Sequence, residues 1–264
     1  MPDQEPTDPV DVSEHVAYRD AAYWAKAVTT LEVGELPARA VNLNVQGRRV
    51  AGPVQGFGKM WQKTYRVRIP HARITPEELI RVWRARFPSF WPKGNLFYGP
   101  LTELSPGDVA VLNLKAVGPM KLSTGIFVLY ADETSFTFMT PEGHQWSAWI
   151  TFSAYAEDHN VVAQVQPLLR ASDPIFEMGA WIMRRMEDAF WQRTLGNLAA
   201  HFGARDAEVT VETLCVDKKR QWRMAKNVRH NSLIRTIVYL SETPFRLMRR
   251  RLQSFRRNPG REVG

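Results

Sequence analysis

The chain has 264 residues, of which 44% are hydrophobic, and its 35 Lys or Arg against 27 Asp or Glu give a formal net charge of +8. This length and apolar content allow one domain with a substantial core plus extensions. The single cysteine, Cys215, excludes an intramolecular disulfide framework. The acidic first residues and the absence of an apolar run of about 18 residues exclude a signal peptide and a membrane-spanning helix, so we expect a cytoplasmic protein.

The positive charge is concentrated at the C-terminal end of the sequence. Residues 216–264 contain 14 Lys or Arg and 3 Asp or Glu, which leaves 21 basic and 24 acidic residues in the first 215. A slightly negative body with a cationic tail predicts that the tail meets an anionic surface while the body has another task.

The chain divides into four predicted parts. Residues 1–14 are rich in Pro and acidic groups, so we expect them to be disordered. Residues 15–55 form an N-terminal extension, within which residues 17–29 have the pattern of a short helix. A connection rich in Gly and Pro then leads into the main domain, residues 56–203, and residues 204–264 form a basic extension.

Two hydrophobic periods mark the start of the main domain. Residues 57–69 alternate, with Trp61 and Tyr65 on the apolar face, which predicts a half-buried strand. From Thr75 the period becomes helical, because Thr75-Pro-Glu-Glu78 is a capping box with Pro at the first helical position. Pro88 ends that helix, and the segment Phe87–Trp91 predicts a second, short helical elbow.

Six strand-like runs follow, separated by short links that are acidic or contain Gly and Pro. Such links between alternating runs are typical of an antiparallel meander. The predicted strands are residues 96–104, 109–117, 122–130, 135–140, 145–155 and 161–170. Together with the first strand they predict a seven-stranded antiparallel sheet. A further strand is predicted over residues 208–216.

One long helix is predicted from Asp173 to His201. Asp173-Pro174 supplies an N-cap and a Pro at the first helical position, and Gly203 is placed to end the helix. Ile182 and Met186 belong to an apolar face that we expect to close over an apolar layer. A neighbouring flank is apolar as well, so the helix should be covered on more than one side.

The order of strand, helical elbow, six strands and long helix resembles that of a known superfamily. Five short stretches strengthen the likeness: Gly56-Phe-Gly-Lys-Met-Trp61, Phe87-Pro-Ser-Phe-Trp91, Leu122-Ser-Thr-Gly125, Phe136-Thr-Phe-Met-Thr-Pro-Glu-Gly-His144 and Arg170-Ala-Ser-Asp-Pro174. They resemble an uncharacterised subgroup of the START/Bet v 1-like (SRPBCC, polyketide cyclase-type) helix-grip superfamily over residues 55–203, with an extension to Asn231. The resemblance implies an α+β fold in which a curved antiparallel sheet wraps the long helix around an internal cavity. One fold of this kind hosts carriers, sensors and cyclases.

Motifs for catalysis and metal binding are missing from the sequence. It contains no HExxH, paired CxxC, P-loop or GxSxG, and its six histidines are scattered singly. We therefore expect no catalytic residues, no metal and no cofactor. An enzyme would need at least two ionisable groups within hydrogen-bond reach of one ligand position.

Candidate ligand-binding residues come from the first strand, the strand region after residue 140 and the long helix. Arg193 shares the face of Ile182, and its guanidinium could hold the carboxylate or phosphate of an apolar ligand; alternatively it pairs with a surface acid. His144 is placed as an acid or base at the cavity mouth, or as a turn histidine bonded to nearby backbone. The predicted ligand-binding residues are Trp61, Tyr65, His144, Ile182, Met186 and Arg193.

The last residues predict a cationic amphipathic helix. Phe245, Met248, Leu252 and Phe255 recur at helical spacing, and arginines such as Arg249 fill the positions between them. Such a helix suits an anionic membrane surface, and these five are the predicted membrane contacts. A helix docked on the protein's own apolar flank is the alternative. No motif that reads bases accompanies the charge, so no specific nucleic acid is expected.

These observations predict a protein that binds or carries a hydrophobic small molecule or lipid in an internal cavity. Its predicted partners are that ligand and an anionic membrane surface, which would make the protein cytoplasmic and peripheral to the membrane. The alternative is a polyketide cyclase or aromatase-like enzyme that uses the same cavity.

Overall fold

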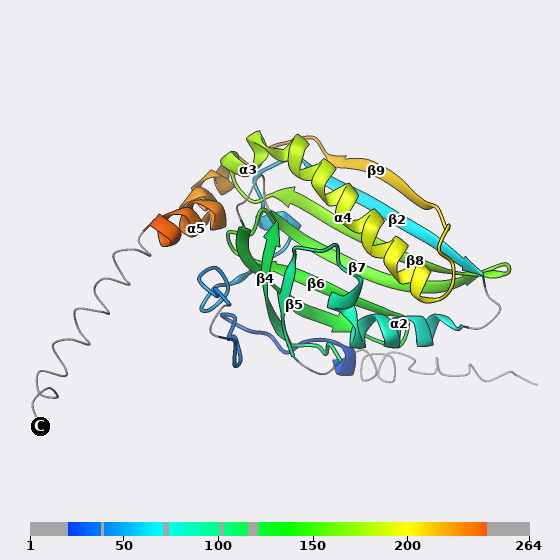
Figure 1. Cartoon of the computed structure of the whole chain (residues 1–264). Coiled ribbons are helices and arrows are strands. Elements are labelled where there is room, and N and C mark those ends of the chain that lie inside the picture. Colours follow the sequence, from blue (N-terminus) through cyan, green and yellow to red (C-terminus); the bar gives the residue numbers. More distant parts are fainter. Residues whose placement is uncertain (1–20, 38–39, 71–73, 101–102, 116–120, 242–264) are drawn as a thin grey trace, which may run out of the picture.

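A computed structural model describes residues 21–37, 40–70, 74–100, 103–115 and 121–241. One large antiparallel sheet dominates the fold, and helices α2 and α4 cover one of its faces (Figure 1). Residues of both helices and of the central strands belong to a single buried apolar cluster. The predicted α+β helix-grip fold is therefore confirmed by the arrangement of the elements.

The sheet runs in the order β3-β4-β5-β6-β7-β8-β2-β9, and β1 pairs with β6 beside this path. All seven strands of the predicted sheet are present, although β3 ends well before residue 104. The predicted additional strand is β9, which pairs with β2, and β1 was not predicted. The strands are β1 (Val50–Ala51), β2 (Met60–Pro70), β3 (Leu96–Tyr98), β4 (Val109–Lys115), β5 (Lys121–Ala131), β6 (Ser135–Pro141), β7 (Trp146–Glu157), β8 (Asn160–Ala171) and β9 (Val209–Asp217).

Helices fill the concave face and the C-terminal end of the described chain. At the start of α2 the Thr75 hydroxyl accepts a hydrogen bond from the Glu78 backbone N–H, as the capping box predicts. The helices are η1 (Pro53–Gln55), α2 (Pro76–Ala85), η3 (Phe87–Phe90), α3 (Pro174–Met178), α4 (Ala180–His201), η4 (Trp222–His230) and α5 (Ser232–Ser241).

The prediction of one continuous helix from Asp173 to His201 is wrong at Gly179. Asp173 does act as an N-cap, because its carboxylate accepts from the N–H groups of Ile175 and Phe176. The helix it starts ends at Met178, and Gly179 separates α3 from α4. Glycine has a low helix propensity, so the chain can change direction there at little cost.

The predicted inward face of α4 is wrong as well. Ile182 and Met186 are 38% and 39% exposed, whereas the second apolar flank, with Trp191, Leu195 and Leu198, packs on the sheet. Both flanks are apolar, so periodicity alone could not choose between them. The buried flank also carries the acidic residues that pair with a lysine buried on β2, as described below.

The N-terminal extension covers the other face of β3, β4 and β5. Its Leu31 and Val45 form a second apolar cluster with Tyr98, Val111 and Phe127 of those strands. Of the helix predicted over residues 17–29, only residues 21–23 of the described part are helical. Trp24 instead forms a β-bridge with Tyr130 of β5, so the prediction is wrong for residues 24–29, while residues 17–20 lie outside the described residues.

Aromatic rings fill the space between α2, η3 and the sheet. Trp83 and Phe87 are fully buried, and Phe87 makes edge contacts with Phe136, Phe138 and Phe152 at centroid distances of 5.2 to 5.7 Å. Edge-to-face geometry is the favourable arrangement for such rings. The bulky residues of the predicted elbow therefore form the core beneath α2.

Gly143, in the turn between β6 and β7, makes a close backbone contact with the end of η4. Its φ is +91°, a side-chain carbon there would clash with the His230 carbonyl oxygen, and its own carbonyl accepts from the Ser232 N–H. We expect Gly143→Ala to destabilise the fold by about 2–4 kcal/mol, measured by urea unfolding. Gly107→Ala is the matched control, since Gly107 has a φ of +98° and nothing within 4 Å. Equal losses in the two variants would contradict a role for the contact.

Candidate functional site

A cavity of about 620 Å³ lies between the N-terminal extension, the end of α2 and β3. This volume is within the range of roughly 300–1,000 Å³ that is usual for small-molecule sites. Most of its walls are apolar. They include Leu36, Pro37, Ala85, Phe97, Tyr98 and Leu104.

A few polar groups interrupt these apolar walls. The Tyr98 hydroxyl is buried and has no hydrogen-bond partner among the described residues. Glu35 and Arg84 also line the cavity. Because the Tyr98 hydroxyl has no accessible surface, Glu35 and Arg84 are the polar residues that a ligand in the cavity can meet.

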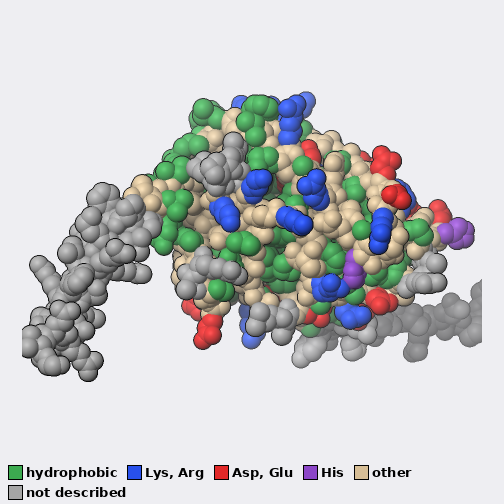
Figure 2. Space-filling view, in the orientation of Figure 1, with side chains coloured by type: hydrophobic (Ala, Val, Ile, Leu, Met, Phe, Trp, Pro, Cys, Tyr) green, Lys and Arg blue, Asp and Glu red, His purple; other side chains and the backbone are tan. Residues whose placement is uncertain are grey.

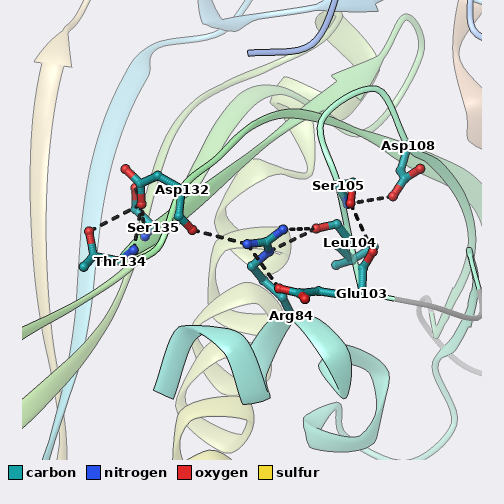
Figure 3. Close-up of polar contacts among 8 residues, drawn as sticks. All are labelled: Arg84, Glu103, Leu104, Ser105, Asp108, Asp132, Thr134 and Ser135. Atoms are coloured by element: carbon teal, nitrogen blue, oxygen red, sulfur yellow. Dashed lines mark hydrogen bonds and ion pairs between the residues drawn. The ribbon is translucent and has the colours of Figure 1, made fainter. Parts of the chain in front are cut away.

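Arg84 fixes one wall of the cavity in place (Figure 3). Its guanidinium donates from Nε and Nη2 to the Leu104 carbonyl at 3.0 and 2.6 Å, and from Nη1 to the Asp132 carbonyl at 3.2 Å. Nη1 also lies 3.1 Å from the Glu103 carboxylate. One side chain of α2 thus holds two loops, and most of its donors are already used by the protein.

Asp132 shapes the turn on which Arg84 closes. Its carboxylate accepts hydrogen bonds from the Tyr130 hydroxyl and from the N–H groups of Thr134 and Ser135. Burial raises the pKa of Asp132, but these hydrogen bonds outweigh it and hold the pKa below the ordinary value. The turn therefore keeps its conformation, with the Asp132 carbonyl directed at Arg84, at any pH at which the Asp132 carboxyl is ionised.

A second polar cluster lies between β2 and α4, centred on Lys63. Lys63 is 2% exposed, and its Nζ lies 2.6 Å from Oδ1 of Asp188 and donates to the Arg184 carbonyl at 3.2 Å. The Tyr65 hydroxyl donates to the same Asp188 oxygen at 2.7 Å. The cluster thus joins the first long strand of the sheet to the middle of the helix.

Glu187 is the least satisfied member of this cluster. Its Oε2 is buried without a hydrogen bond, 3.9 Å from the Lys63 Nζ. The pKa of Glu187 is raised to about 7, mainly by burial; Lys63 opposes this rise and the Asp188 carboxylate adds to it. Glu187 is therefore an internal acid that can exchange its proton near neutral pH.

The structure distributes the six predicted ligand-binding residues over three places. Trp61 and Tyr65 face α4, and Tyr65 belongs to the Lys63 cluster, where burial foremost raises the pKa of its phenol. Ile182, Met186 and Arg193 lie on the exposed side of α4. None of the six lines the cavity between α2 and β3.

His144 occupies the third place, the turn between β6 and β7. It is 5% exposed, and its Nδ1 accepts a hydrogen bond from the Trp146 N–H at 2.9 Å. Burial lowers the pKa of His144 to about 4, so the ring is neutral near pH 7. This arrangement is that of a turn histidine bonded to nearby backbone, the alternative that the sequence left open.

Sequence reasoning did not assign Tyr98, Arg84, Glu187 or Asp188 to a site. For Glu187 a signal exists, because it lies one helical turn before Trp191 on the flank that is buried. A buried acid needs a cation to pair with. Lys63 is a candidate, because it lies between the apolar residues Trp61 and Tyr65 on the same face of β2. Tyr98 and Arg84 carry no such signal, since the cavity is formed by segments far apart in sequence.

The sheet order and the packing of α4 define a helix-grip protein. No family model matches the chain, and no curated protein sequence is similar to it. Similar solved structures include TTHA0849 from Thermus thermophilus, at 16% identity and a TM-score of 0.43, which covers 54% of this chain and 97% of that one. The di-domain ARO/CYC StfQ from the steffimycin biosynthetic pathway matches at 9% identity and a TM-score of 0.45, over 56% of this chain and 52% of that one. Ara h 8.0201 matches at 12% identity and a TM-score of 0.39, over 55% of this chain and 99% of that one. At these identities the likeness concerns the fold alone.

Two further features of the described part bear on function. None of its helices has the length and apolarity that crossing a bilayer requires. Its His, Cys, Asp and Glu side chains form no group of three or more that is placed to hold a metal ion.

Proposed function

We propose that this protein binds a hydrophobic small molecule in the cavity between the N-terminal extension, α2 and β3. The observation that supports this proposal is the cavity itself, about 620 Å³ with mainly apolar walls. Apolar walls with a small number of polar groups are typical of sites that bind small molecules.

The chemistry of the walls indicates the class of ligand. An apolar body fits against Leu36, Phe97 and Leu104, and Glu35 and Arg84 are the charged residues of the wall. Arg84 contributes mainly by holding the loop of Leu104, because its guanidinium is engaged with that loop and with Asp132. We therefore expect a largely uncharged and mainly apolar ligand.

Filling the cavity is the direct test. We expect Ala85→Trp to weaken the binding of the uncharged fluorescent probe N-phenyl-1-naphthylamine at least tenfold in a titration, because the indole takes up space in the cavity. Ala189→Trp is the matched control, since Ala189 is an exposed helical alanine on α4. Equal probe binding by wild type and Ala85→Trp would reject the cavity as the site.

Tyr98→Phe is a second control, on the wall of the cavity itself. The ring remains and only the hydroxyl is removed, so binding of the apolar probe should stay within about twofold of wild type. Native mass spectrometry of the purified protein would then show whether a small molecule co-purifies with it.

The finer parts of the proposal concern the type of ligand and where it is loaded. We propose a lipid or another hydrophobic metabolite as the ligand, taken up at an anionic membrane surface. The predicted membrane-contact residues Phe245, Met248, Arg249, Leu252 and Phe255 lie outside the described residues. The alternative, a cyclase-like enzyme, gains no support from the Lys63 cluster, because Lys63 and Tyr65 are bonded to Asp188.

A further inference from the structure

Helix α5 turns its polar side chains toward the domain. Ser232 and Thr236 are buried, and the Asn44 side chain donates to the Thr236 hydroxyl at 3.1 Å. Arg235 donates to the Asn44 side-chain oxygen and to the Leu43 carbonyl, each at 3.1 Å. The helix is thus attached to the N-terminal extension by hydrogen bonds.

The outward side of α5 is apolar. Ile234, Ile237, Val238 and Leu240 are 40%, 46%, 48% and 52% exposed, and the first three follow the i, i+3, i+4 spacing of one helix stripe. Arg235 is the helix's one charged residue, and it is directed inward. A surface helix in water normally buries its apolar side chains and exposes its polar ones. The exposed apolar stripe of α5 therefore indicates a surface that contacts something other than water.

The chain on the N-terminal side of α5 is strongly basic. Residues 218–231 contain six Lys or Arg and no Asp or Glu. Within them Trp222 is 74% exposed and rests edge-on against Phe57 at 5.2 Å between centroids. An exposed tryptophan among cations is typical of a surface that sits at the headgroup level of a membrane.

The end of α3 and the start of α4 have the same character. Met178 and Trp181 are 82% and 56% exposed, and residues 178–186 contain two Arg and no acid. The Arg185 guanidinium lies 5.5 Å from the centre of the Trp181 ring. Arg220, just before η4, pairs with Glu177 of α3 at 3.1 Å, which places the two regions side by side. Figure 1 shows α3, the start of α4 and α5 at one end of the molecule, and Figure 2 shows both hydrophobic and basic side chains there.

We propose that α5, η4 and the α3–α4 junction form a face that docks on an anionic lipid bilayer. The apolar stripe of α5 and the rings of Trp181 and Trp222 would enter the interfacial region, while the surrounding Lys and Arg meet lipid phosphates. Charge complementarity selects an anionic surface, and the uncharged stripe selects a bilayer over nucleic acid, which would leave that stripe in water. This face lies within the described domain and does not depend on ligand binding or on residues 242–264.

Cosedimentation of the full-length chain with vesicles tests the proposal. We expect at least tenfold tighter binding to vesicles of phosphatidylcholine with 30% phosphatidylserine than to phosphatidylcholine alone. Ile237→Ser with Val238→Ser should weaken binding to the anionic vesicles at least tenfold. Val28→Ser with Leu214→Ser is the matched control, since these residues are 40% and 62% exposed elsewhere. Arg223→Gln with Lys226→Gln should reduce the preference for anionic lipid.

The outcomes separate this face from its rivals. Ile237→Ser with Val238→Ser should weaken vesicle binding equally in a chain that also carries Phe245→Ser, Met248→Ser and Phe255→Ser. If the two α5 substitutions do not weaken binding in that chain, the proposal is overturned. The proposal is also overturned if Ile237→Ser with Val238→Ser binds anionic vesicles within twofold of wild type. An equal loss of binding in the control, Val28→Ser with Leu214→Ser, has the same consequence. The proposal is also overturned if the wild type is a dimer that Ile237→Ser with Val238→Ser converts to a monomer. The apolar stripe of α5 would then contact a second copy of the chain. Unchanged probe binding in the cavity shows that the domain is intact and keeps this test apart from that of the proposed function.

Discussion

Replacing Lys63 with Met is expected to lower the free energy of unfolding by about 3 kcal/mol, because removing one member of a buried ion pair leaves its partner without compensation. The side chain of Lys63 is 2% exposed and that of Asp188 is 33% exposed, so water can solvate part of the remaining charge. This partial access keeps the expected loss at the low end of the range for buried pairs. Urea unfolding at pH 7 measures it.

A double-mutant cycle shows whether the loss comes from the pair. Asp188→Asn in the Lys63→Met background should cost much less than in the wild type, since the acid then has no lysine to lose. Lys121→Met is a matched control, as Lys121 is an exposed lysine on a strand. A Lys63→Met protein as stable as this control would contradict the role assigned to the cluster.

Glu187→Gln is expected to change how the free energy of unfolding depends on pH. The pKa of Glu187 is raised from 4.5 to about 7, so the folded protein holds this proton over a range in which the unfolded chain has lost it. The contribution of Glu187 is therefore complete below pH 4.5 and is lost as pH rises to 7. Relative to the Gln variant, the wild type should lose roughly 3 kcal/mol over that range.

His144 acts in the opposite direction and provides the internal comparison. Its pKa is lowered from 6.5 to about 4, so its contribution is complete above pH 6.5 and is lost as pH falls toward 4. The two slopes oppose each other between pH 4.5 and 6.5 in the wild type. In the Glu187→Gln variant the slope of His144 remains, together with that of His230, whose pKa is also lowered by burial, and stability should rise with pH. Parallel stability curves for wild type and variant, measured by urea unfolding from pH 4.5 to 7.5, would rule this out.

Local patterns predicted the main strands of the sheet and the starts of α2 and α3. Alternation identified the strands because one face of an antiparallel sheet is buried and the other is not. Thr75 and Asp173 were recognised as caps because their side chains satisfy N–H groups within the same turn. Such interactions span only a few residues, so the sequence around them contains the whole signal.

Features set by distant segments could not be predicted in this way. The choice between two apolar flanks of α4 depends on Lys63, more than 100 residues earlier in the chain. The outward apolar stripe of α5 depends on Asn44 occupying the inner side of that helix. The cavity of Tyr98 and Arg84 has no pattern of its own, because the N-terminal extension, α2 and β3 each supply part of it.

The position of β2 has a consequence for how the chain reaches its native state during synthesis. β2 is made early, but its neighbours β8 and β9 come much later, as the contacts of Arg66 with Gln164 and Glu212 span 98 and 146 residues. Such long sequence separations slow folding, and a strand with unpaired edges is prone to aggregate until its partner strands are synthesised. Arg66, Arg68 and Lys63 place three cations on this strand. We expect their like charges to disfavour pairing with a second nascent copy of β2 before β8 and β9 are synthesised.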